Sequence, residues 1–328
     1  MEVASAHLTY CSNIHPGESW AEVKRQLEGP VLAVRGQFPE HERFGVGLRL
    51  SAAAAATLQA ETELAQLRAF LADNGLYVFT LNGFPYGNFH GQPVKESVYL
   101  PDWRQTERSE YTAHLTHVLA QLLPEGQRGS ISTVPGGFKA HLDQSGVAQV
   151  AARLLEQAVA LQRVAQDSGK HIALALEPEP CCLLETTAET LAFFRDYLLP
   201  RRALEWVKNT LQLASVEHAE AVVRAHLGVC IDTCHAAVEF ETADATVDAL
   251  ESAGIQIAKL QLSAGMQLFP KNATQLNHAM QYDERVYLHQ VVSRSANGNL
   301  LRFVDLPEAY ASSEARQAVS SAYSRNSP

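Results

Sequence analysis

Short apolar runs alternate with longer amphipathic stretches along most of the chain. Six of these runs are rich in aliphatic residues and stop at polar residues, glycine or proline, as buried strands do. They cover residues 7–14, 76–81, 129–134, 171–176, 227–231 and 255–262. The stretches between them carry apolar side chains at helical spacing, which predicts helices at residues 20–27, 57–72, 108–122, 147–166, 188–197, 217–225 and 245–253.

This order predicts an α/β fold in which a parallel sheet is covered by helices. A (β/α) barrel and an open doubly wound sheet both have such an order. The open sheet usually binds a nucleotide at a glycine-rich first turn, whereas the first run here ends in Asn13-Ile14-His15-Pro16-Gly17. Polar residues follow nearly every predicted strand, which favours a barrel with its site at the strand ends. We expect one domain over residues 1–328.

The C-terminal part of the sequence departs from this pattern. A barrel of this kind needs eight strands, and only six runs precede residue 263. Within residues 286–306, Asn297-Gly298 lies between two apolar runs, which predicts a hairpin outside the barrel. Residues 307–328 are polar and predict an irregular tail. We therefore expect a barrel without its last two strands, either because the chain is truncated or ends in an unrelated tail, or because the hairpin fills the gap.

Composition narrows the class of protein. The chain has 328 residues, of which 46% are hydrophobic, enough for a large core. Asp and Glu number 36 against 26 Lys and Arg, and the net charge of −10 argues against nucleic acid or an anionic membrane as the main partner. There is no apolar run of about 18 residues and no signal peptide, so we expect a cytoplasmic protein without membrane insertion.

Two acidic residues stand at the ends of neighbouring predicted strands. Glu177 follows the fourth run and Asp232 follows the fifth. Adjacent strands lie about 5 Å apart, so both carboxylates could reach one divalent ion. His235, three residues after Asp232, could hydrogen-bond a substrate hydroxyl. Oxygen and imidazole ligands suit Mn, Mg, Zn or Co. The alternatives are a solvated Glu177 and an Asp232 that only caps the next helix.

Other polar residues at the strand ends are weaker candidates. We expect His15, Asn82, His90 and Ser263 to line a substrate site. Glu179 and Glu239 are expected to be solvated or in salt bridges. The loop after the second run is rich in aromatic residues, which would either stack on a flat ligand or pack as a lid; they are Phe84, Tyr86, Phe89, Tyr99 and Trp103.

Several motifs resemble a known family. The barrel pattern with Glu177 and the Asp232-x-x-His235 motif resembles the xylose isomerase-like TIM barrels, which include sugar isomerases, epimerases and endonuclease IV. The resemblance is closer to the EboE family of metabolite traffic proteins, encoded in the bacterial Ebo gene cluster. It rests on HLTYCSNIHPGESW (7–20), TLNGFPYGNFHG (80–91), VKESVYLPDW (94–103), ALEPEP (175–180), CIDTCHAAVEFE (230–241) and KLQLSAG (259–265).

The resemblance implies roles for individual residues. Glu177 would bind a divalent metal and move a proton, Asp232 would bind the metal, and His235 would contact substrate. A histidine commonly binds the metal from the sixth predicted strand, where this sequence has Gln261; we expect Gln261 to be the third metal contact and to weaken metal binding or change the metal preferred. The family's last ligand, a glutamate on the eighth strand, has no counterpart that we find here.

Two functions follow from these observations. One is a metal-dependent isomerase or epimerase for a small keto or polyhydroxylated compound, within the secondary-metabolite processing that the family name implies. The alternative is a non-catalytic barrel that binds an aromatic metabolite and hands it on. Partners would be a small-molecule metabolite and other Ebo-cluster proteins. A nuclease resembling endonuclease IV is disfavoured by the acidic charge and the scarcity of histidine ligands.

Overall fold

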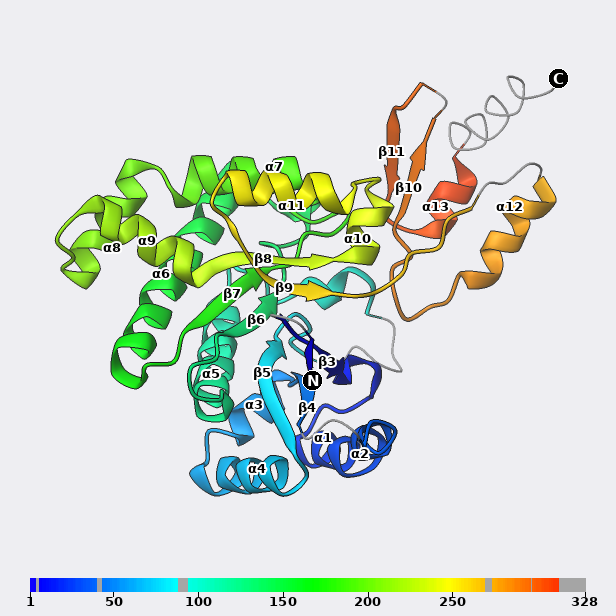
Figure 1. The fold of residues 1–328 in the computed structure, drawn as a ribbon. Coiled ribbons are helices and arrows are strands. Elements are labelled where there is room, and N and C mark those ends of the chain that lie inside the picture. Colours follow the sequence, from blue (N-terminus) through cyan, green and yellow to red (C-terminus); the bar gives the residue numbers. More distant parts are fainter. Residues whose placement is uncertain (4–5, 40–42, 88–93, 269–272, 296, 313–328) are drawn as a thin grey trace.

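A curled sheet of seven parallel strands forms the centre of the protein (Figure 1). The computed structural model describes the whole chain except residues 4–5, 40–42, 88–93, 269–272, 296 and 313–328. The strands pair in chain order, each parallel to the one before it. They are β3 (Thr9–Cys11), β4 (Phe44–Arg49), β5 (Leu76–Asn82), β6 (Gly129–Thr133), β7 (Ile172–Leu176), β8 (Leu227–Asp232) and β9 (Gln256–Gln261).

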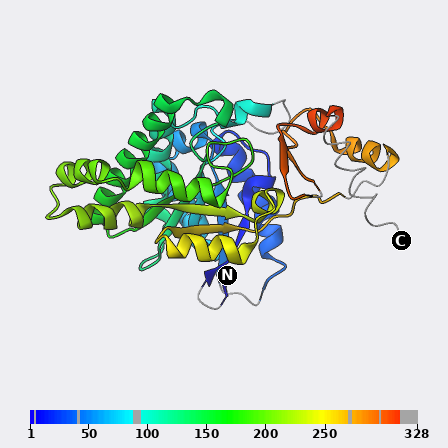
Figure 2. The same cartoon turned by 90° about the horizontal axis from the view of Figure 1, so that it is seen from above.

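Helices follow the strands and cover the outer face of the sheet (Figures 1 and 2). They are α1 (Trp20–Gln26), α2 (Leu32–Arg35), α3 (Ala52–Thr57), α4 (Glu61–Asp73), α5 (Thr106–Leu122), α6 (Gln144–Ser168), α7 (Thr187–Phe193), α8 (Arg201–Leu211), α9 (Val216–His226), α10 (Thr233–Val238) and α11 (Ala243–Ser252). The predicted α/β fold class is confirmed: a parallel sheet covered by helices curls into an incomplete barrel, which in the described residues has seven strands, so that one strand of eight is lacking where two were expected. None of the helices that the structure describes is long and apolar enough to span a bilayer.

The prediction of six strands before residue 263 is wrong by one, because β4 was not expected. Its outward residues are apolar, but Gly45 and Gly47 alternate with them, and glycine is rare in strands. The neighbouring strand β3 explains the glycines. A Cβ at Gly45 would lie 2.6 Å from the Leu8 carbonyl oxygen, and one at Gly47 would lie 2.9 Å from the Thr9 hydroxyl. The strands expected to be fourth, fifth and sixth are therefore the fifth, sixth and seventh.

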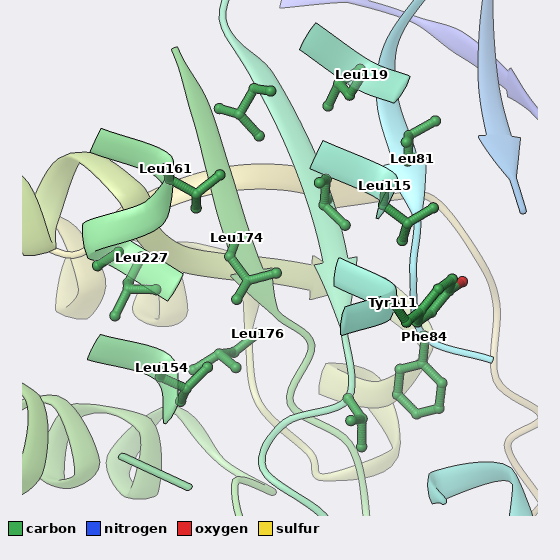
Figure 3. Close-up of a cluster of buried hydrophobic side chains, with 14 of the residues drawn as sticks. Leu81, Phe84, Tyr111, Leu115, Leu119, Leu154, Leu161, Leu174, Leu176 and Leu227 are labelled. Atoms are coloured by element: carbon green, nitrogen blue, oxygen red, sulfur yellow. The ribbon is translucent and has the colours of Figure 1, made fainter. Parts of the chain in front are cut away.

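The hydrophobic core lies between the sheet and its helices. Leu174 and Leu176 of β7 point outward onto Leu154 and Leu161 of α6 (Figure 3), and all four side chains are fully buried. Residues on a strand alternate between its two faces, so every second residue faces the inside of the barrel. These inward residues are small on the central strands, for example Ser132 and Cys230. In barrels the carboxyl ends of the strands are the place for chemistry.

The ring stays open between β3 and β9, since no strand in the described part of the chain pairs with their outer edges. Beyond β9 the chain forms α12 (Ala273–Ala279), an antiparallel hairpin of β10 (Val291–Arg294) and β11 (Leu300–Phe303), and α13 (Leu306–Ala311). The tail expected to be irregular from residue 307 thus begins with a helix. A small antiparallel pair, β1 (Glu2–Val3) and β2 (Ala6–His7), lies at the N-terminus.

The hairpin is attached to the barrel by an ion pair. Arg302 of β11 donates to Glu239 Oε2 from two guanidinium nitrogens, at 2.9 and 2.6 Å. The Glu239 side chain is fully buried, whereas that of Arg302 is 33% exposed. A buried carboxylate needs such a partner, because an unpaired charge in a protein interior is strongly unfavourable. Glu239 was expected to be either solvated or in a salt bridge, and the structure shows the salt bridge.

We expect Arg302→Met to release the hairpin from the barrel. The substitution leaves the Glu239 carboxylate buried without its cation, a loss of about 3 kcal/mol or more. Amides of β10 and β11 should then exchange faster with solvent, as measured by hydrogen exchange and mass spectrometry. The double variant Arg302→Met/Glu239→Gln removes the unpaired charge and should recover part of the protection. Unchanged exchange in Arg302→Met would show that other contacts, such as the hydrogen bonds of Gln290 to Tyr99 and Pro180, suffice to hold the hairpin.

Candidate functional site

The two acids predicted from the strand ends lie side by side. Asp232 is the last residue of β8, and Glu177 follows the last residue of β7. The backbone N–H of Glu177 donates to the Thr133 carbonyl of β6 at 3.1 Å, which continues the sheet by one residue. Both acids are buried, with exposures of 4% for Glu177 and 5% for Asp232. The alternative of a solvated Glu177 is therefore wrong.

Gln261 joins the two carboxylates. It ends β9 and is the direct strand partner of Asp232. Its amide nitrogen Nε2 donates to Asp232 Oδ2 at 2.6 Å and to Glu177 Oε1 at 3.1 Å. The predicted metal contacts Glu177, Asp232 and Gln261 thus meet at one point. The atom that Gln261 presents is a hydrogen-bond donor, which a cation cannot bind.

Asp232 also caps the following helix. Its Oδ1 atom accepts the backbone N–H of Cys234 at the start of α10, at 2.8 Å, and the hydroxyl of Ser263. These two donors hold one carboxylate oxygen and leave Oδ2 to face Glu177. The capping role and the position at the site therefore coexist. Ser263, predicted to contact substrate, lies beside Asp232 and donates to it, and its contact with substrate stays a prediction.

His235 completes a group of three possible metal ligands. One nitrogen of its ring and one oxygen each of Glu177 and Asp232 all lie within 4.8 Å of one another. Its Nε2 atom also lies 3.6 Å from Glu179 Oε2. Burial lowers the pKa of His235, but the surrounding carboxylates, Glu179 foremost, outweigh burial and raise it above its usual value. A metal ion and a proton would therefore compete for this ring.

The electrostatics of the site raise the pKa of Glu177 towards neutral pH, although the carboxylate is still mostly charged at pH 7. Burial raises the pKa of Glu177 to about 6, although His235 and Lys259 attract the charged form. Burial likewise raises the pKa of Glu179. A carboxylate whose pKa lies close to the working pH can both accept and return a proton, as a general acid or base does.

Two residues at the site were not expected there. Glu179 is 6% exposed and lies between His235 and the thiol of Cys182, so of its two predicted states, solvated or in a salt bridge, the structure shows the ionic contact, with His235 at 3.6 Å. Lys259 of β9 was not singled out at all. Its Nζ atom donates to Ser132 of β6 at 3.0 Å, across the inside of the barrel. Its place two residues before Gln261 on one strand is the signal that could have revealed it, since alternate residues share a face.

The other predicted substrate contacts lie elsewhere or are not described. Asn82 is buried at the end of β5, where its side-chain oxygen accepts the N–H of Phe84 at 3.0 Å and closes a turn. His15 lies 2.9 Å from the Tyr10 hydroxyl and lines a hollow with Gly17 and Leu27, which are outside the acid cluster. His90 falls outside the described residues. The roles of these three residues stay predictions.

The aromatic residues after β5 pack inside the protein. Trp103 is fully buried, and its ring nitrogen donates to the Val134 carbonyl at 3.1 Å. Tyr99 is 3% exposed and stacks on Phe138. Phe84 is also buried, and Tyr86 packs against Tyr111. Trp103, Tyr99 and Phe84 therefore offer no free face to a flat ligand, whereas Tyr86 is partly exposed, so stacking on an aromatic ligand stays a prediction. Phe89 lies outside the described residues.

The donor set fits a divalent cation. Two carboxylates and an imidazole are ligands of Mn²⁺, Co²⁺ and Zn²⁺. Glu177 Oε2 and His235 Nδ1 are buried and have no hydrogen-bond partner among the described residues. Buried polar atoms are almost always paired, so these two atoms are suited to a bound ligand. A second group that could hold a metal, Asp283, His289 and Asp305, is more exposed, and Asp305 is already paired with Lys95 at 2.6 Å.

Comparisons with known proteins find likeness in structure only. No family model matches the sequence, and no curated protein matches it. A crystal structure of the 3-keto-D-glucoside 4-epimerase YcjR from E. coli is similar over 97% of this chain and 98% of that chain, with a TM-score of 0.44 and 17% identity. The IolI protein, solved with a bound zinc atom, is similar over 78% of this chain and 89% of that chain, with a TM-score of 0.42 and 13% identity. At this level of likeness, an activity has to be argued from the chain's own side chains.

Cation binding should depend on pH because Glu177 must lose its proton first. With a pKa of about 6, the carboxylate is charged above that pH and neutral below it. The apparent affinity for Mn²⁺ should therefore fall as pH decreases through 6, by roughly tenfold per pH unit for each proton displaced. The raised pKa of His235 should steepen the fall. Calorimetric titration between pH 5 and 8 measures this, and a flat profile would contradict the assignment of these ligands.

Proposed function

We propose that the protein is a divalent-metal-dependent isomerase or epimerase that acts on a small keto or polyhydroxylated compound. One observation carries this proposal. Glu177, Asp232 and His235 converge at the carboxyl ends of parallel strands, and two of their ligand atoms are buried without a partner among the described residues. This is the edge at which barrels of this class place their chemistry.

Glu177, Asp232 and His235 would hold the metal. When bound, a divalent cation polarises substrate oxygens and so acidifies the carbon next to a carbonyl. Neighbouring hydroxyl and carbonyl oxygens of a sugar-like compound could both approach from the mouth of the barrel. We therefore expect the substrate to be a compound that carries a hydroxyl group next to a carbonyl group.

Glu177 is the group best suited to move the proton. Its raised pKa lets it take a proton from the acidified carbon and return it to the adjacent carbon, which isomerises an aldose or ketose. Return of the proton to the opposite face of the same carbon would be an epimerisation and needs a second group on that face. His235 has an alternative role: if another group took its place as a metal ligand, its ring would hydrogen-bond a substrate oxygen. Positioning such groups around one carbon supplies several kcal/mol of barrier reduction.

Proton exchange into a panel of simple sugars tests the proposal and does not require the natural substrate. The purified protein is loaded with Mn²⁺, Co²⁺, Zn²⁺ or Mg²⁺, its metal content is measured by mass spectrometry, and ketopentoses and ketohexoses are incubated with it in D₂O. We expect about one metal per chain and deuterium at the carbon next to the carbonyl of at least one sugar. A protein that retains no metal and exchanges no proton would contradict the proposed function.

We further propose that this activity serves the processing of a secondary metabolite in the cytoplasm, as in the EboE family. The six quoted motifs, spread over residues 7–265, support this finer assignment. Affinity purification from the native cell should then recover proteins encoded beside its gene. Recovery of none of them, together with unchanged metabolite profiles on gene deletion, would remove this part of the proposal.

A further inference from the structure

The Gln261 amide is hydrogen-bonded to both acids, and a metal ion bound between them would have to break these hydrogen bonds. Its Nε2 atom lies 2.6 Å from Asp232 Oδ2 and 3.1 Å from Glu177 Oε1, so both of its hydrogens point at carboxylate oxygens. Carboxylates accept hydrogen bonds and do not donate them, so only the nitrogen end of the amide can fill this place. The amide thus bridges two like charges, as a cation would.

The contested oxygen can be named. Asp232 Oδ1 is already held by the Cys234 N–H at 2.8 Å and by the Ser263 hydroxyl, which leaves Oδ2 as the oxygen for a metal. That oxygen makes the shortest contact with Gln261. On Glu177, Oε1 is bound to the amide while Oε2 has no partner among the described residues. A cation would displace no hydrogen bond at the buried Glu177 Oε2 but would meet the amide at Asp232 Oδ2.

The oxygen end of the Gln261 amide has no hydrogen bond that would oppose a movement of the side chain. Gln261 Oε1 is buried and makes no hydrogen bond within the described part of the chain, so the side chain is held at this site by its nitrogen alone. Direct pairing of Gln261 with Asp232 on β8 and β9 keeps the side chain on the inner face. A cation and the amide hydrogens cannot share one space, because both are positive.

We propose that the Gln261 amide and a divalent cation are alternative partners of the same carboxylate pair, so that Gln261 weakens cation binding by competing with it. The proposal rests on the proposed metal-binding function and adds a residue that sets the affinity of that site. Charge-assisted hydrogen bonds are stronger than ordinary ones, so breaking them lowers the affinity measurably. Removing a competitor should increase the affinity for the cation, whereas removing a metal ligand should decrease it, so the direction of the change in affinity distinguishes the two roles.

Calorimetric titration of the metal-free protein with Mn²⁺ tests the proposal, in the wild type and in Gln261→Ala. We expect Gln261→Ala to bind Mn²⁺ about tenfold more tightly, since a charge-assisted hydrogen bond no longer has to be broken. The metal-free variant should also melt at a lower temperature, because the two carboxylates lose their bridge. Gln261→Leu fills the space, can neither donate nor bind metal, and should change the affinity in the same direction if the alanine variant does not fold.

Each other outcome has a distinct meaning. Weaker Mn²⁺ binding by Gln261→Ala would show that Gln261 is a ligand, and an unchanged affinity would show that it is a bystander; both overturn the competition. Absence of binding in the wild type and in both Gln261 variants would instead refute the proposed function, and the inference with it. Glu177→Gln, which lacks a ligand, serves as the variant that should not bind.

Discussion

Replacing Glu177 with glutamine is expected to abolish both cation binding and proton exchange. The substitution keeps the shape of the side chain but removes the charge and the unpartnered oxygen that faces the site. Loss of a ligand should weaken Mn²⁺ binding by about 100-fold or more, given that even supporting residues around a metal are worth about 10–100-fold. Loss of the base should slow exchange by a further factor of about 10²–10⁴. Calorimetry and deuterium incorporation measure the two effects.

The matched control is Glu179→Gln. Glu179 is buried in the same region and carries the same charge, but it is not one of the three convergent ligands. If binding depends on specific ligation, Glu179→Gln, which removes only a neighbour of the ligand His235, should weaken it by about 10–100-fold at most, less than Glu177→Gln does. Equal losses in the two variants would mean that only the negative charge of the region matters, and the assignment of Glu177 as ligand and base would be wrong.

Replacing Arg108 with methionine is expected to have the largest effect on stability. Arg108 is fully buried in α5 and donates to three backbone carbonyls: those of Pro101 at 2.8 Å, Gly83 at 2.8 Å and Phe84 at 2.9 Å. Burial lowers its pKa to about 10, so it stays charged at neutral pH. Arg108 thereby fixes the loop after β5 to the segment that precedes α5, close to the strand ends that form the site.

The methionine leaves all three carbonyls buried without this donor. We expect the free energy of unfolding to fall by about 3–5 kcal/mol and the melting temperature by on the order of 10 °C. Arg201→Met is the control, because the Arg201 side chain is 82% exposed and forms a surface ion pair with Glu205. It should change stability by less than about 0.5 kcal/mol. Comparable urea midpoints for the two variants would show that the buried arginine does not hold these loops.

The sequence predicted most strands because apolar runs and their polar ends are local signals. The strand after Lys170, for example, runs over Ile172–Leu176 where residues 171–176 were expected. β4 was missed because Gly45 and Gly47 reflect the close approach of β3, which no local pattern shows. The helix α8 was missed as well, although its amphipathic pattern spans Arg201–Leu211.

The site was predictable where it depends on position along a strand and unpredictable where it depends on orientation. Glu177 and Asp232 follow neighbouring strands, so their convergence could be inferred from order alone. Which end of the Gln261 amide faces them depends on hydrogen bonds in three dimensions. The burial of Glu179 depends on how its loop folds back, whereas Lys259 could have been found from the sequence, because it lies two residues before Gln261 on a predicted strand.

The central claim is that Glu177, Asp232 and His235 share one divalent cation. Anomalous diffraction from crystals grown with Mn²⁺ would locate such an ion directly. We predict one strong anomalous peak within ligand distance of Glu177 Oε2, Asp232 Oδ2 and the His235 ring. A peak only at Asp283, His289 and Asp305, or no peak at Mn²⁺ concentrations that saturate binding in solution, would contradict the claim.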